Sequence, residues 1–112
     1  MKKELVIQLH KNFEDYIHTD ENGVEFWYAR ELQKLMEYAK WDTFKNVIEK
    51  AKEACKNSNI EPLEHFPEVR KKVEIGSGAE KEIKDYKLTR YACYLIAQNG
   101  DPKKSVIAPY FE

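Results

Sequence analysis

The stretch LTRYACYLIAQNGDPKK, Leu88–Lys104, decides the fold. Thr89 is a suitable N-cap, because its hydroxyl can accept one of the free amide protons of a first helical turn. The run Tyr91–Ala97 leaves almost no polar side, which predicts a helix buried on most sides. Asn99–Gly100 then predicts a left-handed C-cap, and Pro102 prevents the helix from continuing. The rest of the chain is therefore expected to pack around a central helix.

The size and composition of the chain are those of one ordinary domain. Its 112 residues, 42% hydrophobic and 35% charged, predict a single soluble domain over residues 1–112. No apolar run approaches the roughly 20 residues of a membrane-spanning helix, and the N-terminus lacks the apolar core of a secretory signal. Cys55 and Cys93 lie in predicted helices without metal-ligand spacing, so both are expected to be reduced, buried thiols. These features predict a cytoplasmic protein without membrane contact.

The charges are unevenly distributed along the chain. The net charge of −1 argues against a protein that coats DNA through a strongly basic surface. Residues 70–112 hold nine Lys and Arg against six Asp and Glu, whereas residues 1–39 hold five against eight. Any field that attracts anions is therefore expected in the C-terminal third.

The first part of the chain predicts a helix followed by a β-hairpin. Apolar residues three and four apart predict the helix over residues 3–15. The segments YIHT and VEFWY, rich in β-branched and aromatic residues, then flank a turn that ends at Gly23. Glycine readily adopts the positive φ that such a turn needs, so these segments predict a hairpin.

Two helices are predicted next, over residues 29–38 and 43–57, because apolar residues recur on one face of each. The short turn between them makes the pair helix-turn-helix-like, with Asp42 or Thr43 as the expected cap of the second helix. The start of that helix is where a recognition helix contacts bases. The candidate nucleic-acid-binding residues of the pair are Arg30, Lys40, Lys45 and Asn46. Acidic residues interleave with them, so a solvated charged surface remains the alternative.

A second hairpin follows an irregular connection over residues 57–69, which contains two prolines. The segments KKVEI and IKDYKL flank a glycine-rich tip and resemble a wing, whose lysines can lie along a phosphate backbone. Arg90, beside the cap of the central helix, is expected to point to the same side. The candidate binding residues here are Lys71, Lys72, Gly76, Ser77, Gly78, Lys81, Lys84 and Arg90.

Together these segments predict an α+β fold: a single compact domain with helices packed on two short β-hairpins, a helix-turn-helix-like pair and a buried central helix. Both hairpins are expected to pack against the central helix.

Trp27 and Trp41 are candidates for stacking on bases, although aromatic residues of a compact domain more often belong to the core.

No arrangement of residues predicts catalysis. His10, His18 and His65 lie in separate elements, and none has a carboxylate or cysteine at metal-ligand spacing. The glycines at 76 and 78 join two strands, whereas a phosphate-binding loop opens a helix. We therefore expect no enzyme activity, no metal and no cofactor.

Three strings carry a resemblance to a known family: EFWYARELQKLMEY, KAKEAC and GSGAEKEIKDYKLTRYACYLIAQNGDPKK. They closely resemble the DNA-damage-inducible protein D family, whose N-terminal part is similar to the Bro-N domain of phage antirepressors and baculovirus repeated proteins. The resemblance covers residues 3–107. Family members look more than twice as long, and Pro109–Glu112 replaces their usual continuation.

The resemblance implies a non-catalytic regulatory domain of the DNA-damage (SOS) response or of phage-like control, in a bacterial or phage-related setting. Its implied partner is DNA, single- or double-stranded, or a DNA-bound protein such as the recombinase filament. The alternative is a protein-interaction or dimerisation module, which includes a homodimer, without direct nucleic-acid contact.

Overall fold

A four-stranded antiparallel sheet organises the computed structural model, which describes residues 13–101. Its strands are, in spatial order, β1 (His18–Thr19), β2 (Glu25–Tyr28), β4 (Glu80–Leu88) and β3 (Glu68–Glu74). Both predicted hairpins are present. The pairing of Trp27 with Leu88 joins them into one sheet, which the sequence did not predict. Most of the helix predicted over residues 3–15 lies outside the described residues.

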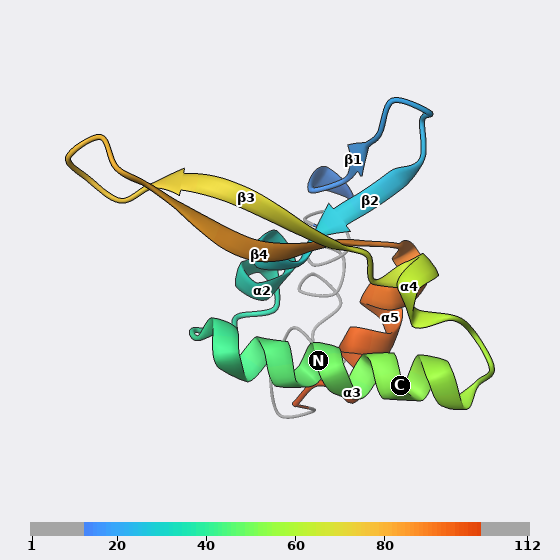
Figure 1. Cartoon of the computed structure of the whole chain (residues 1–112). Helices are drawn as coiled ribbons and strands as arrows, with labels where there is room; N and C mark the ends of the chain where they lie inside the picture. Colours follow the sequence, from blue (N-terminus) through green and yellow to red (C-terminus); the bar gives the residue numbers. More distant parts are fainter. Residues whose placement is uncertain (1–12, 102–112) are drawn as a thin grey trace.

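The helices lie on one side of this sheet, with α5 packed against α3 (Figure 1). They are α2 (Ala29–Leu35), α3 (Trp41–Asn57), α4 (Pro62–His65) and α5 (Arg90–Asn99). The core between the layers contains side chains from both hairpins and both long helices, among them Trp27, Phe44, Ile48, Tyr86, Leu88 and Ile96. The predicted α+β class of compact domain is therefore confirmed.

The predicted central helix, α5, is present but has an exposed side. The Thr89 hydroxyl accepts the backbone N–H of Ala92 at 3.1 Å, which confirms the cap. Tyr94 is 49% exposed, so the expectation of burial on most sides was too strong. The buried side packs mainly against α3 and also against β2 and β4, so strands of both hairpins contact it, as expected. Gly100 is extended, with φ −82°, so the expected left-handed cap is wrong.

The helix-turn-helix-like pair is formed by α2 and α3, with corrected ends. α2 ends at Leu35 instead of residue 38, because Glu37 adopts a positive φ of 61° and turns the chain. α3 begins at Trp41 without a side-chain cap, so the expected cap at Asp42 or Thr43 is wrong. The predicted inward face of α3 is confirmed, since all five of its members are buried: Phe44, Val47, Ile48, Ala51 and Cys55.

The connection predicted to be irregular contains the short helix α4. Pro62 occupies its first turn, where a missing N–H costs nothing. The Glu61 carboxylate caps the helix by accepting the backbone N–H of Leu63 at 3.2 Å. β3 then begins at Glu68, so the irregular part is shorter than residues 57–69.

The second hairpin is longer than predicted and projects from the body of the domain (Figure 1). Cross-strand pairs run from Glu68 opposite Tyr86 to Glu74 opposite Glu80. Gly76 and Gly78 both have positive φ, 87° and 75°, as a tight tip requires. We call β3, β4 and the tip between them the arm. Within residues 13–101, no helix combines the length and the apolar character that crossing a membrane requires.

Candidate nucleic-acid interface

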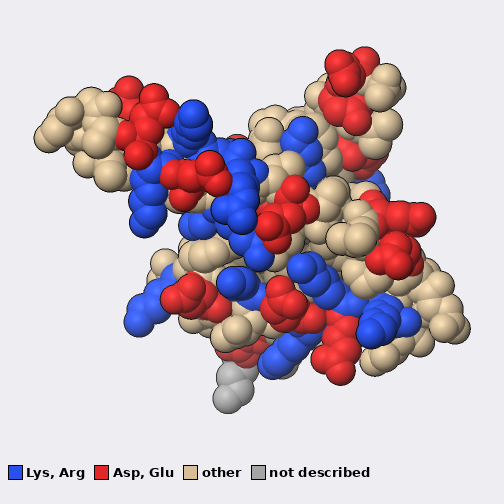
Figure 2. Space-filling model, viewed as in Figure 1, with Lys and Arg blue, Asp and Glu red and all other residues tan. Residues whose placement is uncertain are grey.

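The structure separates the predicted binding residues into two groups. One group lies on the arm and the other on α2 and α3. Figure 2 shows that blue Lys and Arg side chains on the arm alternate with red Asp and Glu. Local pairing therefore decides which cations are available to an anionic ligand.

Three of the six cations of the arm are ion-paired. Antiparallel register places side chains of β3 directly beside those of β4. The closest contacts are Lys84 Nζ to Glu68 Oε1 at 2.8 Å, Lys71 Nζ to Asp85 Oδ2 at 2.9 Å, and Arg70 Nη1 to Glu82 Oε1 at 3.1 Å. The hydrogen bond between Lys84 and Glu68 raises the pKa of the amine and lowers the pKa of the carboxyl. A phosphate would have to compete with these carboxylates.

Two of the lysines predicted to bind nucleic acid on the arm differ from the others in their contacts. Lys72 and Lys81 are exposed, and neither is in an ion pair within the described part of the chain. Their neighbours across the strands are Glu82 and Val73. The predicted tip residues Gly76, Ser77 and Gly78 are exposed as well, but Glu74 and Glu80 lie at the base of the tip. Together with Lys87 at the base of the arm, these lysines give three ammonium groups outside any ion pair of the described residues, among side chains of both charges.

Lys71 and Arg30 have structural contacts. Asp85 is fully buried, and its Oδ1 accepts the backbone N–H groups of Arg30 and Tyr86 at 3.0 and 2.8 Å. The Lys71 ammonium group contacts the other carboxylate oxygen, Oδ2, and neutralises the buried charge of Asp85. Burying a carboxylate is costly unless such partners are present. These contacts fix the first turn of α2 against β4.

The Arg30 side chain covers Trp41. Its Nε donates to the backbone carbonyl of Lys84 at 3.0 Å, and its Cζ lies 3.8 Å from the centroid of the Trp41 ring. This cation–π contact occupies one face of the indole. A base could stack there only after displacing Arg30. Trp27 is 1% exposed, so it belongs to the core.

Arg90 does not lie on the arm. Its guanidinium donates to Glu14 Oε1 at 2.6 Å and to Glu25 Oε2 at 3.0 Å, beside the first hairpin. The hydrogen bond with Glu14 is the main reason that the pKa of Arg90 is raised. The expectation that Arg90 shares a side with the arm is therefore wrong. Sequence spacing could not reveal it, because Glu14 is 76 positions away.

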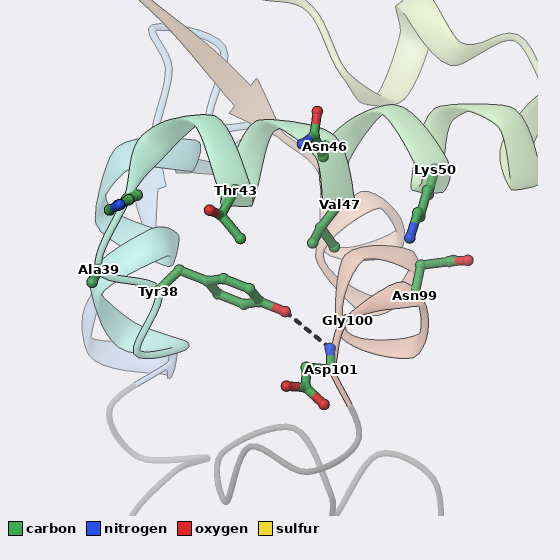
Figure 3. A pocket seen from close by; sticks show the side chains of 10 residues that line it. Tyr38, Ala39, Thr43, Asn46, Val47, Lys50, Asn99, Gly100 and Asp101 are labelled. Atoms are coloured by element: carbon green, nitrogen blue, oxygen red, sulfur yellow. Dashed lines mark hydrogen bonds between the residues drawn. The ribbon is translucent and has the colours of Figure 1, made fainter.

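The second group borders a cavity of about 700 Å³ between α3 and the end of α5 (Figure 3). The predicted residues Lys40 and Asn46 line it, together with Thr43. The sequence missed Lys50 and Asn99, which also line it. Figure 3 shows Thr43 and Val47 pointing into the space and the Lys50 amine directed toward Asn99. We call this space the α3–α5 cavity.

Helical spacing explains why these side chains share one side of α3. Thr43, Asn46 and Lys50 are three and four residues apart, so they form one row, and Lys40 precedes it by one turn. We call Lys40, Thr43, Asn46 and Lys50 the α3 row. Glu53 follows Lys50 by three positions, and Asp101 lines the opposite wall of the cavity. Lys45 belongs to the neighbouring row with Asp42 and Glu49 and does not line the cavity.

The opposite wall of the cavity is held in place by a hydrogen bond. The backbone N–H of Asp101 donates to the Tyr38 hydroxyl at 3.0 Å, which ties the end of α5 to the turn before α3. Tyr38 is itself buried against Phe44, with ring centroids 5.2 Å apart. The site is thus positioned by both the helix pair and α5.

The chemistry of the α3 row is that of an anion-binding surface. Two ammonium groups, a hydroxyl and an amide supply donors for phosphate oxygens, and the amide can also pair with base edges. Within residues 13–101, no group of three His, Cys, Asp or Glu side chains is placed to hold a metal ion. Burial raises the pKa of the Cys93 thiol, which disfavours the nucleophilic thiolate. Both cysteines are buried, as expected.

Comparison with known proteins gives this α+β domain its family. The model of the BRO family, N-terminal domain, matches residues 16–110, and the chain belongs to this family. The chain is also similar to the DNA damage-inducible protein D of Escherichia coli (strain K12), with 48% identity over 99 residues. That similarity covers 88% of this chain and 36% of the relative, so the chain spans little more than a third of the relative's length. No solved structure matches.

Proposed function

We propose that this domain is a non-catalytic regulator, of the DNA-damage response or of phage-type control, which acts in the cytoplasm and binds DNA. Membership of the BRO family and similarity to a protein named for its induction by DNA damage support the regulatory setting. The α3 row along the α3–α5 cavity carries the proposal of DNA contact. It combines two lysines with hydroxyl and amide donors, while the acidic residue that lines the cavity, Asp101, lies on the opposite wall.

The α3 row suits a phosphate backbone in its dimensions. Lys40 and Lys50 are ten positions apart, which corresponds to about 15 Å along a helix. The two ammonium groups can therefore contact separate phosphates, while Thr43 and Asn46 lie between them. Neither lysine is in an ion pair within the described ranges, in contrast to Lys71 and Lys84 of the arm. Binding to these two lysines therefore requires no ion pair between described residues to be broken.

A paired-variant experiment tests this assignment. The variant Lys40→Ala/Lys50→Ala is expected to bind a fluorescein-labelled DNA duplex roughly tenfold more weakly than the unmodified domain, measured by fluorescence anisotropy. The control is Lys34→Ala/Lys56→Ala, which removes the same charge from exposed positions outside the cavity. Circular dichroism checks that both variants fold. An equal loss in the two variants would show that only net charge matters and would contradict the assignment.

The surface of the arm supports a second candidate function, which is contact with a protein. Three of its six cations are ion-paired, and Ile75 at its tip is 59% exposed. Val73 and Ile83 are partly exposed on the same face of the arm as Ile75, since side chains alternate along a strand. A surface that mixes apolar and neutralised charged groups fits a protein such as a DNA-bound recombinase filament better than it fits a polyanion. Retention of such a filament by a domain that binds no free DNA would favour this candidate.

A further inference from the structure

The sheet has a face that the proposed function does not use. Along β2 the side chains alternate, so Trp27 points into the core, where it is 1% exposed, and Phe26 and Tyr28 point to the other side. Both of these rings are partly exposed. Antiparallel pairing places His18 opposite Phe26 and Lys87 opposite Tyr28 on the same face. This is the side of the sheet away from α3 and α5 (Figure 1).

Aromatic rings and ammonium groups interleave on this face. The His18 and Phe26 rings stack with centroids 5.4 Å apart, and Phe26 meets Tyr28 edge to face at 5.2 Å. Lys71 Nζ lies 3.3 Å from the centroid of Tyr28, and Lys87 Nζ lies 4.9 Å from that of Phe26. We call His18, Phe26, Tyr28, Lys71 and Lys87 the aromatic face.

We propose that the aromatic face binds the unpaired bases of a single-stranded nucleic acid. Flat rings stack on any base, and lysines beside them neutralise the backbone, which together is the chemistry of a single-strand platform. The flexible stem of Lys87 allows its amine to leave the Phe26 ring for a phosphate, so that this ring becomes free to meet a base. Duplex bases are already stacked on one another and present only their edges, so a duplex cannot use these rings.

The charges around the rings agree with an anionic ligand. Lys87 is in no ion pair within the described residues, and Lys71 is held by Asp85, which is itself buried beneath the surface. Glu31 lies at one edge, 2.6 Å from His18 Nε2, and does not approach either lysine. The Lys87 ammonium group therefore remains accessible beside the rings, whereas the Lys71 ammonium group is held by Asp85. This proposal rests, like the proposed function, on nucleic-acid binding by the domain. It concerns different residues and specifies a single-stranded ligand.

The test compares one double variant and one single control variant on two ligands. Phe26→Leu/Tyr28→Leu keeps apolar volume and removes the flat rings, and the Tyr28 side chain makes no capping hydrogen bond to α2. The control is Tyr94→Leu, which removes an aromatic ring that is 49% exposed on α5. Affinity for oligothymidine is expected to fall at least about tenfold in the double variant, with duplex affinity and the control unchanged. Oligothymidine binding that survives in the double variant, or falls equally in the control, overturns the proposal.

Photocrosslinking to oligothymidine that carries 4-thiothymidine tests the same site in the unmodified domain. The expected crosslinked peptide contains Phe26 and Tyr28. Crosslinks confined to peptides of α3 would overturn the aromatic face and leave the proposed function intact. Loss of duplex binding in Lys40→Ala/Lys50→Ala with unchanged oligothymidine binding would show that the two surfaces act separately. Absence of binding to either ligand by the unmodified domain would contradict both.

Discussion

The carboxylate of Asp85 accepts the backbone N–H of Arg30 at 3.0 Å, although the two residues are 55 positions apart. This bond joins the middle of β4 to the first turn of α2 and so places the helix pair relative to the sheet. The second oxygen of Asp85 lies 2.9 Å from Lys71 Nζ on β3. One buried side chain thus connects α2 with both strands of the arm.

The first prediction concerns this connection. Asp85→Ala leaves the N–H of Arg30 without its acceptor and Lys71 without its counter-charge, so the free energy of unfolding should fall by about 2–5 kcal/mol. Urea denaturation followed by circular dichroism measures the loss. The control is Glu82→Ala, which removes the exposed ion pair with Arg70 and should cost no more than about 1 kcal/mol. Equal stabilities of the two variants would show that Asp85 is not a central contact.

The second prediction concerns the buried thiol of Cys93. Burial raises its pKa above the ordinary value of 9.0, so the folded state favours the neutral thiol. The resulting stability is complete below about pH 9 and is lost as the pH rises further, because the thiol of the unfolded chain then ionises. Unfolding free energies between pH 8 and about pH 10 should fall less steeply in Cys93→Ala than in the unmodified domain.

Thiol labelling provides an independent check on Cys93. A thiol reagent should react slowly with the native domain and rapidly in denaturant. Rapid native labelling at this cysteine would contradict its burial and reopen a nucleophilic role.

The third prediction separates Arg90 from the binding residues. Because its guanidinium is held by Glu14 and Glu25, Arg90→Ala should leave DNA affinity within about twofold of the unmodified domain. The side chain is half exposed, so the loss of stability should be at most about 1 kcal/mol. Anisotropy and thermal melting measure the two quantities. A large loss of DNA affinity in a folded Arg90→Ala domain would show that Arg90 does contact DNA.

Local patterns predicted the local parts of the fold. The apolar spacing of Phe44, Val47 and Ile48 predicted the inward face of α3, and the hydroxyl of Thr89 predicted the cap of α5. Gly23 has the positive φ expected at the first turn. Each of these signals depends on residues a few positions apart, which a single sequence displays directly.

The remaining features depend on contacts between distant segments. The pairing of Trp27 with Leu88 joins the hairpins, and nothing near either residue specifies it. The α3–α5 cavity brings Lys50 together with Asn99 from another helix. The ion pairs of the arm follow from strand register, which the sequence alone did not establish. The aromatic face did have a local signal, since three consecutive aromatic residues in a strand must point to both of its sides, but a sequence cannot show which side is covered.

The most direct test of the account is the salt dependence of duplex binding. If Lys40 and Lys50 contact phosphates, each contact releases counterions and contributes about 0.9 to the slope of log affinity against log salt. We expect a slope shallower by about two units in Lys40→Ala/Lys50→Ala and an unchanged slope in Lys34→Ala/Lys56→Ala. A slope that is the same in the unmodified domain and in Lys40→Ala/Lys50→Ala would contradict the assignment of the α3 row as the DNA contact.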